Sequence, residues 1–439
     1  MKPSSLSGKR VTAGALMALA FTGCVPLRGD SGSSTSNQGG GPGAGSNTTS
    51  KSINCDIPLT TSVTPQSGRQ HHCAIDIGSS NLKLVVDSIV PGDRLSLRGE
   101  RFCKVQLNLG DHVRNPISGS NPPAYPPVPE TAVDELVEFT RILVDQCAAD
   151  GGEVVGGVAT SWGRRAPNAN DILATLRGAT GVEASVIPGG LEGRYGYWAA
   201  TRGRPGMIAM DAGSSSFQIS YWPLGGTDVL PRSWELGYRQ AAADHFAKKN
   251  DTSAFVHATY DSARDSFLDA LATAFVDATP PDAASPNDTS AAFVTTLQND
   301  IQAQRVERAI IALGEDGSSL LLRQGKLNPG GNWVDRATYL GLMEQLKRER
   351  QVDDNYGIIT GSVTLADAMA MQAMFADRTT FDALRNNTEA WNAYGPKATG
   401  GPVLVEFLMR TLGVERLVLV PQEMPDGFIL DKLGLTNPN

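Results

Sequence analysis

Two stretches of the chain share one pattern of hydrophobic and polar positions. In each, an apolar run ends near an aspartate, Asp76 or Asp211, a turn of glycine and small polar residues follows, and a second apolar run begins. The turns cover residues 78–81 and 213–216. Short apolar runs separated by such turns predict strand, turn and strand. We therefore expect a duplicated unit with a carboxylate at the root of each turn.

The rest of the chain alternates between segments that predict helices and segments that predict strands. Apolar residues of the segment 131–147 recur at helical spacing, whereas the Val- and Gly-rich run 153–160 predicts a parallel strand. Strands that alternate with helices predict the α/β class. Because 439 residues exceed one ordinary core, we expect two domains, at residues 71–203 and 204–439. The other expected elements are helices at 170–178 and 191–201, a strand at 182–187, a surface loop at 277–289, and α/β pieces at 309–322 and 403–420.

The N-terminus has the pattern of an export signal. A basic segment precedes the apolar run 11–21, which is too short to span a bilayer. Small residues directly before Cys24 resemble a bacterial lipoprotein box, although Phe21 departs from the usual aliphatic residue. We expect residues 1–23 to be a lipoprotein signal peptide. Ordinary signal cleavage near Gly23 is the alternative.

The predicted lipoprotein signal determines where in the cell we expect the protein. By the same resemblance, Cys24 becomes lipidated, and the Gly/Ser-rich residues 24–70 form a flexible tether. The protein is then extracytoplasmic and lipid-anchored to a bacterial membrane, at the outer membrane or the periplasmic face. Four further cysteines suit an oxidising compartment, where two disulfides can form by any of three pairings. They are Cys55, Cys73, Cys103 and Cys147. The alternative is that the last two remain buried thiols.

The net charge of the chain limits the kinds of molecule that the protein is expected to bind. A net charge of −8 argues against a general nucleic-acid-binding role, so we expect no nucleic acid partner. A local basic groove is compatible with this balance. The sequence leaves the oligomeric state open, a homodimer included.

The two turns have the composition of phosphate-binding loops. Backbone N–H groups of a Gly/Ser turn can converge on a phosphate, and serine hydroxyls add donors. Carboxylates beside phosphate become useful when a divalent cation lies between them. Asp76 and Asp211 are therefore the candidate ligands of Mg²⁺ or another divalent cation. The candidate phosphate-binding residues are Gly78, Ser79, Ser80, Asn81, Gly213, Ser214, Ser215 and Ser216.

Six motifs follow one another between residues 74 and 237. They are A-I-D-I-G-S-S-N at 74–81, A-T-S-W-G-R-R-A-P-N at 159–168, G-V-E-A at 181–184, I-P-G-G-L-E-G-R at 187–194, D-A-G-S-S-S-F-Q at 211–218 and S-W-E-L-G at 233–237. In order and spacing, this set resembles the exopolyphosphatase / guanosine pentaphosphate phosphatase (Ppx/GppA) family of the actin, sugar kinase and Hsp70 superfamily.

The resemblance implies two ribonuclease-H-like (actin-like ATPase) domains with an interdomain cleft. It places Glu192 on the family's catalytic glutamate, a general base for the attacking water. It places Arg164 on the arginine that grips the phosphoryl group. The neighbouring Arg165 takes this place if the motif is aligned one residue further along the chain. The implied reaction is metal-assisted in-line hydrolysis of terminal phosphoanhydride bonds in polyphosphate or in a guanosine pentaphosphate-like nucleotide. The expected extracytoplasmic location favours polyphosphate.

Departures from the family pattern leave a second function open. Leu191 replaces the first glutamate of a pair, Ser214 and Ser215 replace glycines that tolerate positive φ, and Gln218 replaces the acid that closes the second loop. The alternative is therefore a catalytically impaired phosphate- or polyphosphate-binding lipoprotein that keeps the fold. A kinase-like protein is a third hypothesis, disfavoured because export removes ATP.

Three polar residues of the first strand–turn–strand unit have weaker patterns. Lys83 could face the cleft, although a lysine on a strand is more often solvated. His71 and His72 could bind a metal, but we expect them to lie in a disordered flank.

Overall fold

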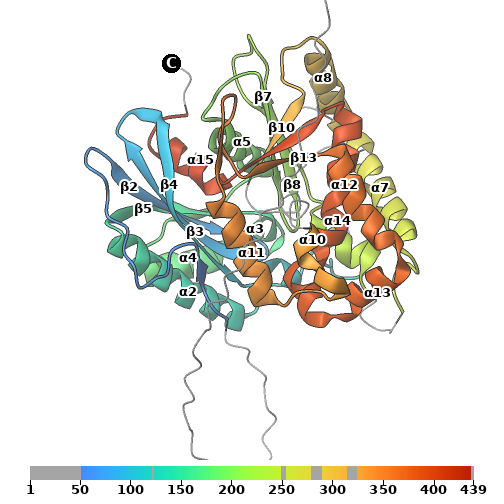
Figure 1. Ribbon diagram of the computed structural model, residues 1–439. Coiled ribbons are helices and arrows are strands. Elements are labelled where there is room, and N and C mark those ends of the chain that lie inside the picture. Colours follow the sequence, from blue (N-terminus) through green and yellow to red (C-terminus); the bar gives the residue numbers. More distant parts are fainter. Residues whose placement is uncertain (1–50, 121–122, 249–253, 278–288, 314–323, 437–439) are drawn as a thin grey trace, which may run out of the picture. The chain divides into compact units, whose positions relative to one another are not determined.

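The computed structural model describes residues 51–120, 123–248, 254–277, 289–313 and 324–436 (Figure 1). The predicted signal peptide, the lipidation at Cys24, most of the predicted tether and most of the loop at 277–289 lie outside these residues, as does the segment 314–322. Within the described ranges, no helix is both long and apolar enough to cross a membrane.

The first sheet is built around the first predicted strand–turn–strand unit. Its strand order is β1-β4-β3-β2-β5-β6, in which β2 pairs antiparallel with β3 and parallel with β5. The β3–β4 pair is antiparallel and the β5–β6 pair is parallel. The strands are β1 (Asn54–Cys55), β2 (Gln70–Ile77), β3 (Asn81–Val90), β4 (Asp93–Gln106), β5 (Gly152–Ala159) and β6 (Ala184–Val186).

The second sheet repeats this topology. Its order is β13-β14-β10-β7-β8-β9, in which β7 pairs antiparallel with β8 and parallel with β10. The β8–β9 pair is antiparallel and the β10–β14 pair is parallel, so β7, β8, β9, β10 and β14 match β2 to β6 in order. The duplication predicted from the two turns is confirmed. The strands are β7 (Met207–Ala212), β8 (Phe217–Trp222), β9 (Leu230–Trp234), β10 (Ala309–Leu313), β13 (Gly361–Thr364) and β14 (Arg416–Val420).

Alternation along the strands gives each sheet two buried faces. On β2, Cys73 and Ile75 join one hydrophobic cluster with α2 (Glu130–Ala149) and α4 (Ala169–Thr180), whereas Ala74 joins another. That second cluster also contains residues of both sheets, α5 (Gly189–Thr201) and α15 (Met424–Lys432). The two halves therefore share a continuous core, in which these two helices pack.

A third cluster covers the other face of the second sheet. Its helices are drawn side by side in Figure 1, and in the chain they lie between β9 and β14. They are α7 (Tyr260–Asp277), α8 (Ser290–Gln302), α12 (Leu365–Ala376), α13 (Arg378–Asn386) and α14 (Thr388–Leu412). The remaining elements are α1 (Leu109–His112), α3 (Ser161–Arg165), α6 (Tyr238–Ala241), the π-turn Ala242–Phe246, α10 (Gln324–Leu327), the 3₁₀ turn Pro329–Gly331, α11 (Arg336–Arg348), β11 (Gln351–Asp353) and β12 (Gly357–Ile359).

The helix predicted from residue 403 begins earlier than expected. In the structure α14 starts at Thr388 and runs through Pro396 and Pro402. Proline removes a helical hydrogen bond and clashes with the preceding turn, so the sequence favoured a start after Pro402. Burial of residues such as Tyr394 and Ala398, both fully inaccessible, offsets the lost hydrogen bonds.

Two disulfides form in the first half. Cys55 bonds Cys103, which joins β1 to β4, and Cys73 bonds Cys147, which joins β2 to α2. The alternative of buried free thiols is wrong.

The segment 51–69 is anchored to the first sheet and is not a free tether. A fully buried ion pair links Arg101 and Asp150, with the Arg101 Nε 2.6 Å from an Asp150 carboxylate oxygen. The same guanidinium donates to the carbonyl oxygens of Ile57 and Pro58. The folded first half therefore includes residues upstream of the predicted boundary at 71.

Candidate phosphate site at the two turns

The two turns have the same backbone geometry. The Gly78 N–H donates to the Asn81 carbonyl oxygen at 2.9 Å, and the Gly213 N–H donates to the Ser216 carbonyl oxygen at 2.8 Å. A Cβ on either glycine would lie within 3.0 Å of the same carbonyl oxygen, so both turns require glycine at this position.

The serines that replace family glycines are compatible with the second turn. Neither Ser214 nor Ser215 adopts a positive φ. The turn therefore does not need the conformational freedom of glycine at these two positions.

Short segments hold the two turns against each other. The Gly110 N–H of α1 donates to the Ser79 carbonyl oxygen at 2.7 Å, and a Cβ on Gly110 would lie 3.2 Å from the Ser215 hydroxyl. A Cβ on Gly237 would lie 2.4 Å or less from the backbone of Ser214. Such close approaches leave no room for side chains at these glycines, and they fix the position of the turns.

A cluster of arginines and glutamates lies near the root of the first turn. The Arg164 guanidinium of α3 contacts Glu192 of α5 at 2.9 Å and Glu235 at 2.6 Å. Arg165 reaches the other carboxylate oxygen of Glu235 at 3.1 Å, and the Ser161 hydroxyl also donates to Glu235. Both arginines considered from the sequence thus converge on one carboxylate, and Arg164 alone touches Glu192.

Glu192 has the electrostatics of a proton acceptor near neutral pH. Burial raises its pKa to about 7, while Arg164 opposes the rise and the charges of Glu235 and Asp76 add to it. Glu192 lies in the first turn of α5, and this helix packs against the second sheet through glycines. A Cβ on Gly196 of this helix would lie 3.7 Å from the Asp211 Cβ.

The candidate metal ligands are embedded in this network. Asp76 lies 3.3 Å from the Lys83 ammonium, which also contacts Glu423 at 3.0 Å. Across the described part of the chain, no three or more His, Cys, Asp or Glu side chains gather in a metal-binding arrangement. Mg²⁺ commonly takes one or two carboxylates and completes its shell with water and substrate phosphate. A metal at Asp76 or Asp211 would therefore have to bind together with its phosphate, because the described side chains form no complete protein cage.

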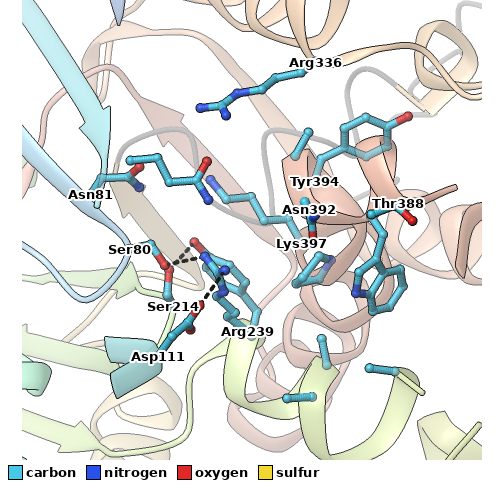
Figure 2. A pocket seen from close by; sticks show the side chains of 18 of the residues that line it. Ser80, Asn81, Asp111, Ser214, Arg239, Arg336, Thr388, Asn392, Tyr394 and Lys397 are labelled. Atoms are coloured by element: carbon cyan, nitrogen blue, oxygen red, sulfur yellow. Dashed lines mark hydrogen bonds and ion pairs between the residues drawn. The ribbon is translucent and has the colours of Figure 1, made fainter. Parts of the chain in front are cut away.

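A pocket of about 580 Å³ opens at the tips of the turns (Figure 2). Ser80, Asn81 and Ser214 line it, whereas Asp76, Arg164, Glu192 and Asp211 do not. The turns therefore present their tips to the pocket and their roots to the acidic residues. The basic residues in its walls are Lys104, Arg114, Arg239, Lys248, Arg336, Arg385 and Lys397; the acidic ones are Asp111 and Asp244.

The structure corrects two sequence-based expectations about the first unit. Lys83 is paired inside the site and not solvated on a strand surface. His71 and His72 are buried in β2 and not part of a disordered flank, and the His71 Nδ1 lies 2.7 Å from the Asp150 carbonyl oxygen.

Sequence reasoning assigned no role to three residues of the site. Glu235 lies in a motif noted above, but its pairing with Arg164 depends on a long-range contact. Arg239 follows the same motif, and Glu423 comes from the start of α15. Only their position next to the motifs could have drawn attention to the first two.

Comparison with known proteins agrees with this architecture. Residues 126–279 match the model of the Ppx/GppA phosphatase family, a region that holds Arg164, Glu192, Asp211, Glu235 and Arg239. An uncharacterized protein of Streptomyces coelicolor is 29% identical over 151 residues. That match covers 34% of this chain and 41% of the relative, so it spans less than half of the relative's length.

Solved structures extend the likeness to most of the chain. The Ppx/GppA family member of Aquifex aeolicus is 15% identical, covers 84% of this chain and 100% of its own, and superposes with a TM-score of 0.53. An exopolyphosphatase of Cytophaga hutchinsonii is also 15% identical, covers 83% of this chain and 98% of its own, and gives a TM-score of 0.51. The fold is therefore the two-domain actin-like fold of these structures.

Proposed function

We propose that this protein is a Ppx/GppA-type phosphatase that hydrolyses terminal phosphoanhydride bonds. The observation that carries the proposal is Glu192, a buried carboxyl with a pKa of about 7, paired with Arg164 near the first of two phosphate-type turns. A general base works best when its pKa lies near the working pH.

Each residue then has a defined task. The N–H groups and hydroxyls of the two turns hold the phosphate chain, and Arg164 binds the phosphoryl oxygens with its guanidinium fork. Glu192 accepts the proton of the attacking water. A divalent cation, held by Asp76 and Asp211 when it is bound with substrate, supplies charge neutralisation. Arg164 can bind phosphate in this way only after its ion pair with Glu235 is broken.

The pocket favours a polyanionic substrate. Its seven basic and two acidic residues stand out in a chain whose net charge is −8. Linear polyphosphate and a nucleotide with a phosphate chain both suit such a pocket, and the proposed export favours polyphosphate. Export, the lipid anchor at Cys24 and a homodimeric state remain proposals that rest on the sequence.

A phosphate-binding protein without turnover is the second candidate. Gln218 takes the place of the family acid, and its amide donates to the hydroxyls of Ser216 and Ser233 at 3.1 and 3.0 Å. A neutral, hydrogen-bonded side chain there supplies no carboxylate near the second turn.

Phosphate release separates the two candidates. The full chain, given polyphosphate with Mg²⁺ or Mn²⁺, should release orthophosphate, and Glu192→Gln should reduce the rate by about 10²- to 10⁴-fold. Glu183→Gln is the matched control, because that exposed glutamate forms an ion pair with the exposed Arg177 at the protein surface. Binding of polyphosphate without release under any of these ions would favour the binding protein.

A further inference from the structure

Arg239 joins the two turns across the pocket. Its guanidinium Nη1 donates to the Ser80 hydroxyl at 3.0 Å and to the Asn108 side-chain oxygen at 2.8 Å. Its Nη2 lies 3.1 Å from a carboxylate oxygen of Asp111. Its backbone N–H donates to the Ser214 carbonyl oxygen at 3.0 Å. The side chain thus reaches the first turn, as Figure 2 shows, while the backbone is bound to the second.

The backbone of Arg239 is held firmly to the second turn. The N–H groups of Tyr238 and Gln240 donate to the carbonyl oxygens of Gly213 and Ser214, on either side of the Arg239 contact. Gly237 packs directly against the same turn. The origin of the side chain is therefore fixed, and its partly exposed guanidinium lies at the pocket wall.

The partner of Arg239 can be exchanged at low cost. Asp111 also pairs with Arg114, so its charge stays compensated if Arg239 turns away. A guanidinium has five N–H donors in a fixed fork that matches phosphate oxygens. An incoming phosphate can replace Asp111 on Arg239 without leaving an isolated carboxylate.

We propose that Arg239 is a phosphate-binding residue that grips an oligophosphate at the point where both turns meet, with Asp111 as its stand-in anion when no ligand is bound. The proposal rests on the phosphate-binding part of the proposed function and not on turnover. Asp111 then competes with the ligand, and it sets how tightly the pocket holds phosphate.

Titration calorimetry with inorganic tripolyphosphate tests this role without catalysis. In the full chain, Arg239→Gln should weaken binding by about tenfold or more, since hydrogen bonds to charged groups contribute more than those between neutral groups. The affinity of Arg239→Lys for tripolyphosphate should lie between those of the wild type and Arg239→Gln, because lysine keeps the charge but lacks the planar fork of donors. The matched control Arg98→Gln removes an exposed arginine outside the pocket walls and should leave binding unchanged.

Asp111→Asn separates ligand binding from a purely structural link between the turns. Loss of the competing carboxylate should tighten tripolyphosphate binding, so the two variants should change affinity in opposite directions. If Arg239 only braces the turns, Asp111→Asn weakens binding or leaves it unaltered, and the proposal is overturned. Failure of the wild-type protein to bind tripolyphosphate, or equal binding by Arg239→Gln, would also overturn it. Binding that follows the expected pattern without phosphate release would support Arg239 and contradict the phosphatase function.

Discussion

The two turns share a backbone but differ in charge. Opposite Asp76 in the first sheet stands Lys83, whereas opposite Asp211 in the second stands Gln218. Lys83 forms ion pairs with Asp76 and Glu423, and Gln218 donates to the hydroxyls of two serines. Duplication has therefore kept the geometry that suits phosphate, while the chemistry of the two copies has diverged.

The helices that follow β6 and β14 differ in the same way. Each helix has an acidic residue followed by glycine in its first turn, Glu192-Gly193 in α5 and Asp426-Gly427 in α15. Glu192 meets Arg164, whereas Asp426 lies against the buried Asp87, and burial raises the pKa of both aspartates. One junction supplies the candidate base, and the other supplies a buried pair of aspartates whose pKa values are raised by burial.

The crossing of the two helices should be the feature most sensitive to mutation. A Cβ on Gly427 would lie 1.9 Å from the Tyr195 carbonyl oxygen. Gly427→Ala should therefore lower the free energy of unfolding by about 3 kcal/mol or more, measured by urea denaturation. Gly178→Ala is the control, since a Cβ there meets nothing within 4 Å, and it should stabilise the protein by about 0.5–1 kcal/mol. Equal effects of the two substitutions would contradict the close crossing.

Making the first turn resemble the second should impair the site. Lys83→Gln removes the cation that pairs with Asp76, and we expect kcat/KM for polyphosphate to fall by about 10- to 100-fold. Steady-state phosphate release measures the change. An unaltered rate would mean that the charge opposite Asp76 has no part in the reaction.

The difference in stability between Glu192→Gln and the wild type should depend on pH. The pKa of Glu192 rises from 4.5 to about 7 on folding, so this carboxyl contributes stability that is fully present below pH 4.5 and is lost as the pH rises to about 7. Glutamine stays neutral throughout. The advantage of the variant over the wild type should grow by roughly 2 kcal/mol between pH 5 and pH 8 in urea melts. A constant difference would place Glu192 in a more solvated environment than the structure gives it.

The smallest expected effect concerns the second turn. Gln218 is 2% exposed, so Gln218→Glu buries a carboxyl and should cost about 1–2 kcal/mol at pH 8. Because burial raises the pKa of a carboxyl, a larger fraction of the new glutamate is neutral at pH 5, and the loss of stability should be smaller there. The half-saturating Mg²⁺ concentration for phosphate release should fall, since a carboxylate returns near Asp211. Weaker Mg²⁺ dependence would argue that the second turn holds no metal.

Local patterns were sufficient to predict the strands on either side of the two turns, the turns themselves and the helix that carries Glu192. The apolar runs and the glycines at 78 and 213 are short-range signals, and the structure has both turns where they were expected. The pairing of the cysteines, the contact of Glu235 with Arg164 and the reach of Arg239 to Ser80 depend on residues far apart in sequence. Such contacts follow from how the two sheets pack, which no single segment encodes.

The pH dependence of phosphate release tests the central assignment most directly. If Glu192 is the general base, kcat/KM for polyphosphate should rise with pH through an apparent pKa of about 7 and then level off. The rise should be absent from the residual activity of Glu192→Gln. A profile that is flat from pH 5.5 to 8.5, or a rise that persists in Glu192→Gln, would contradict the assignment.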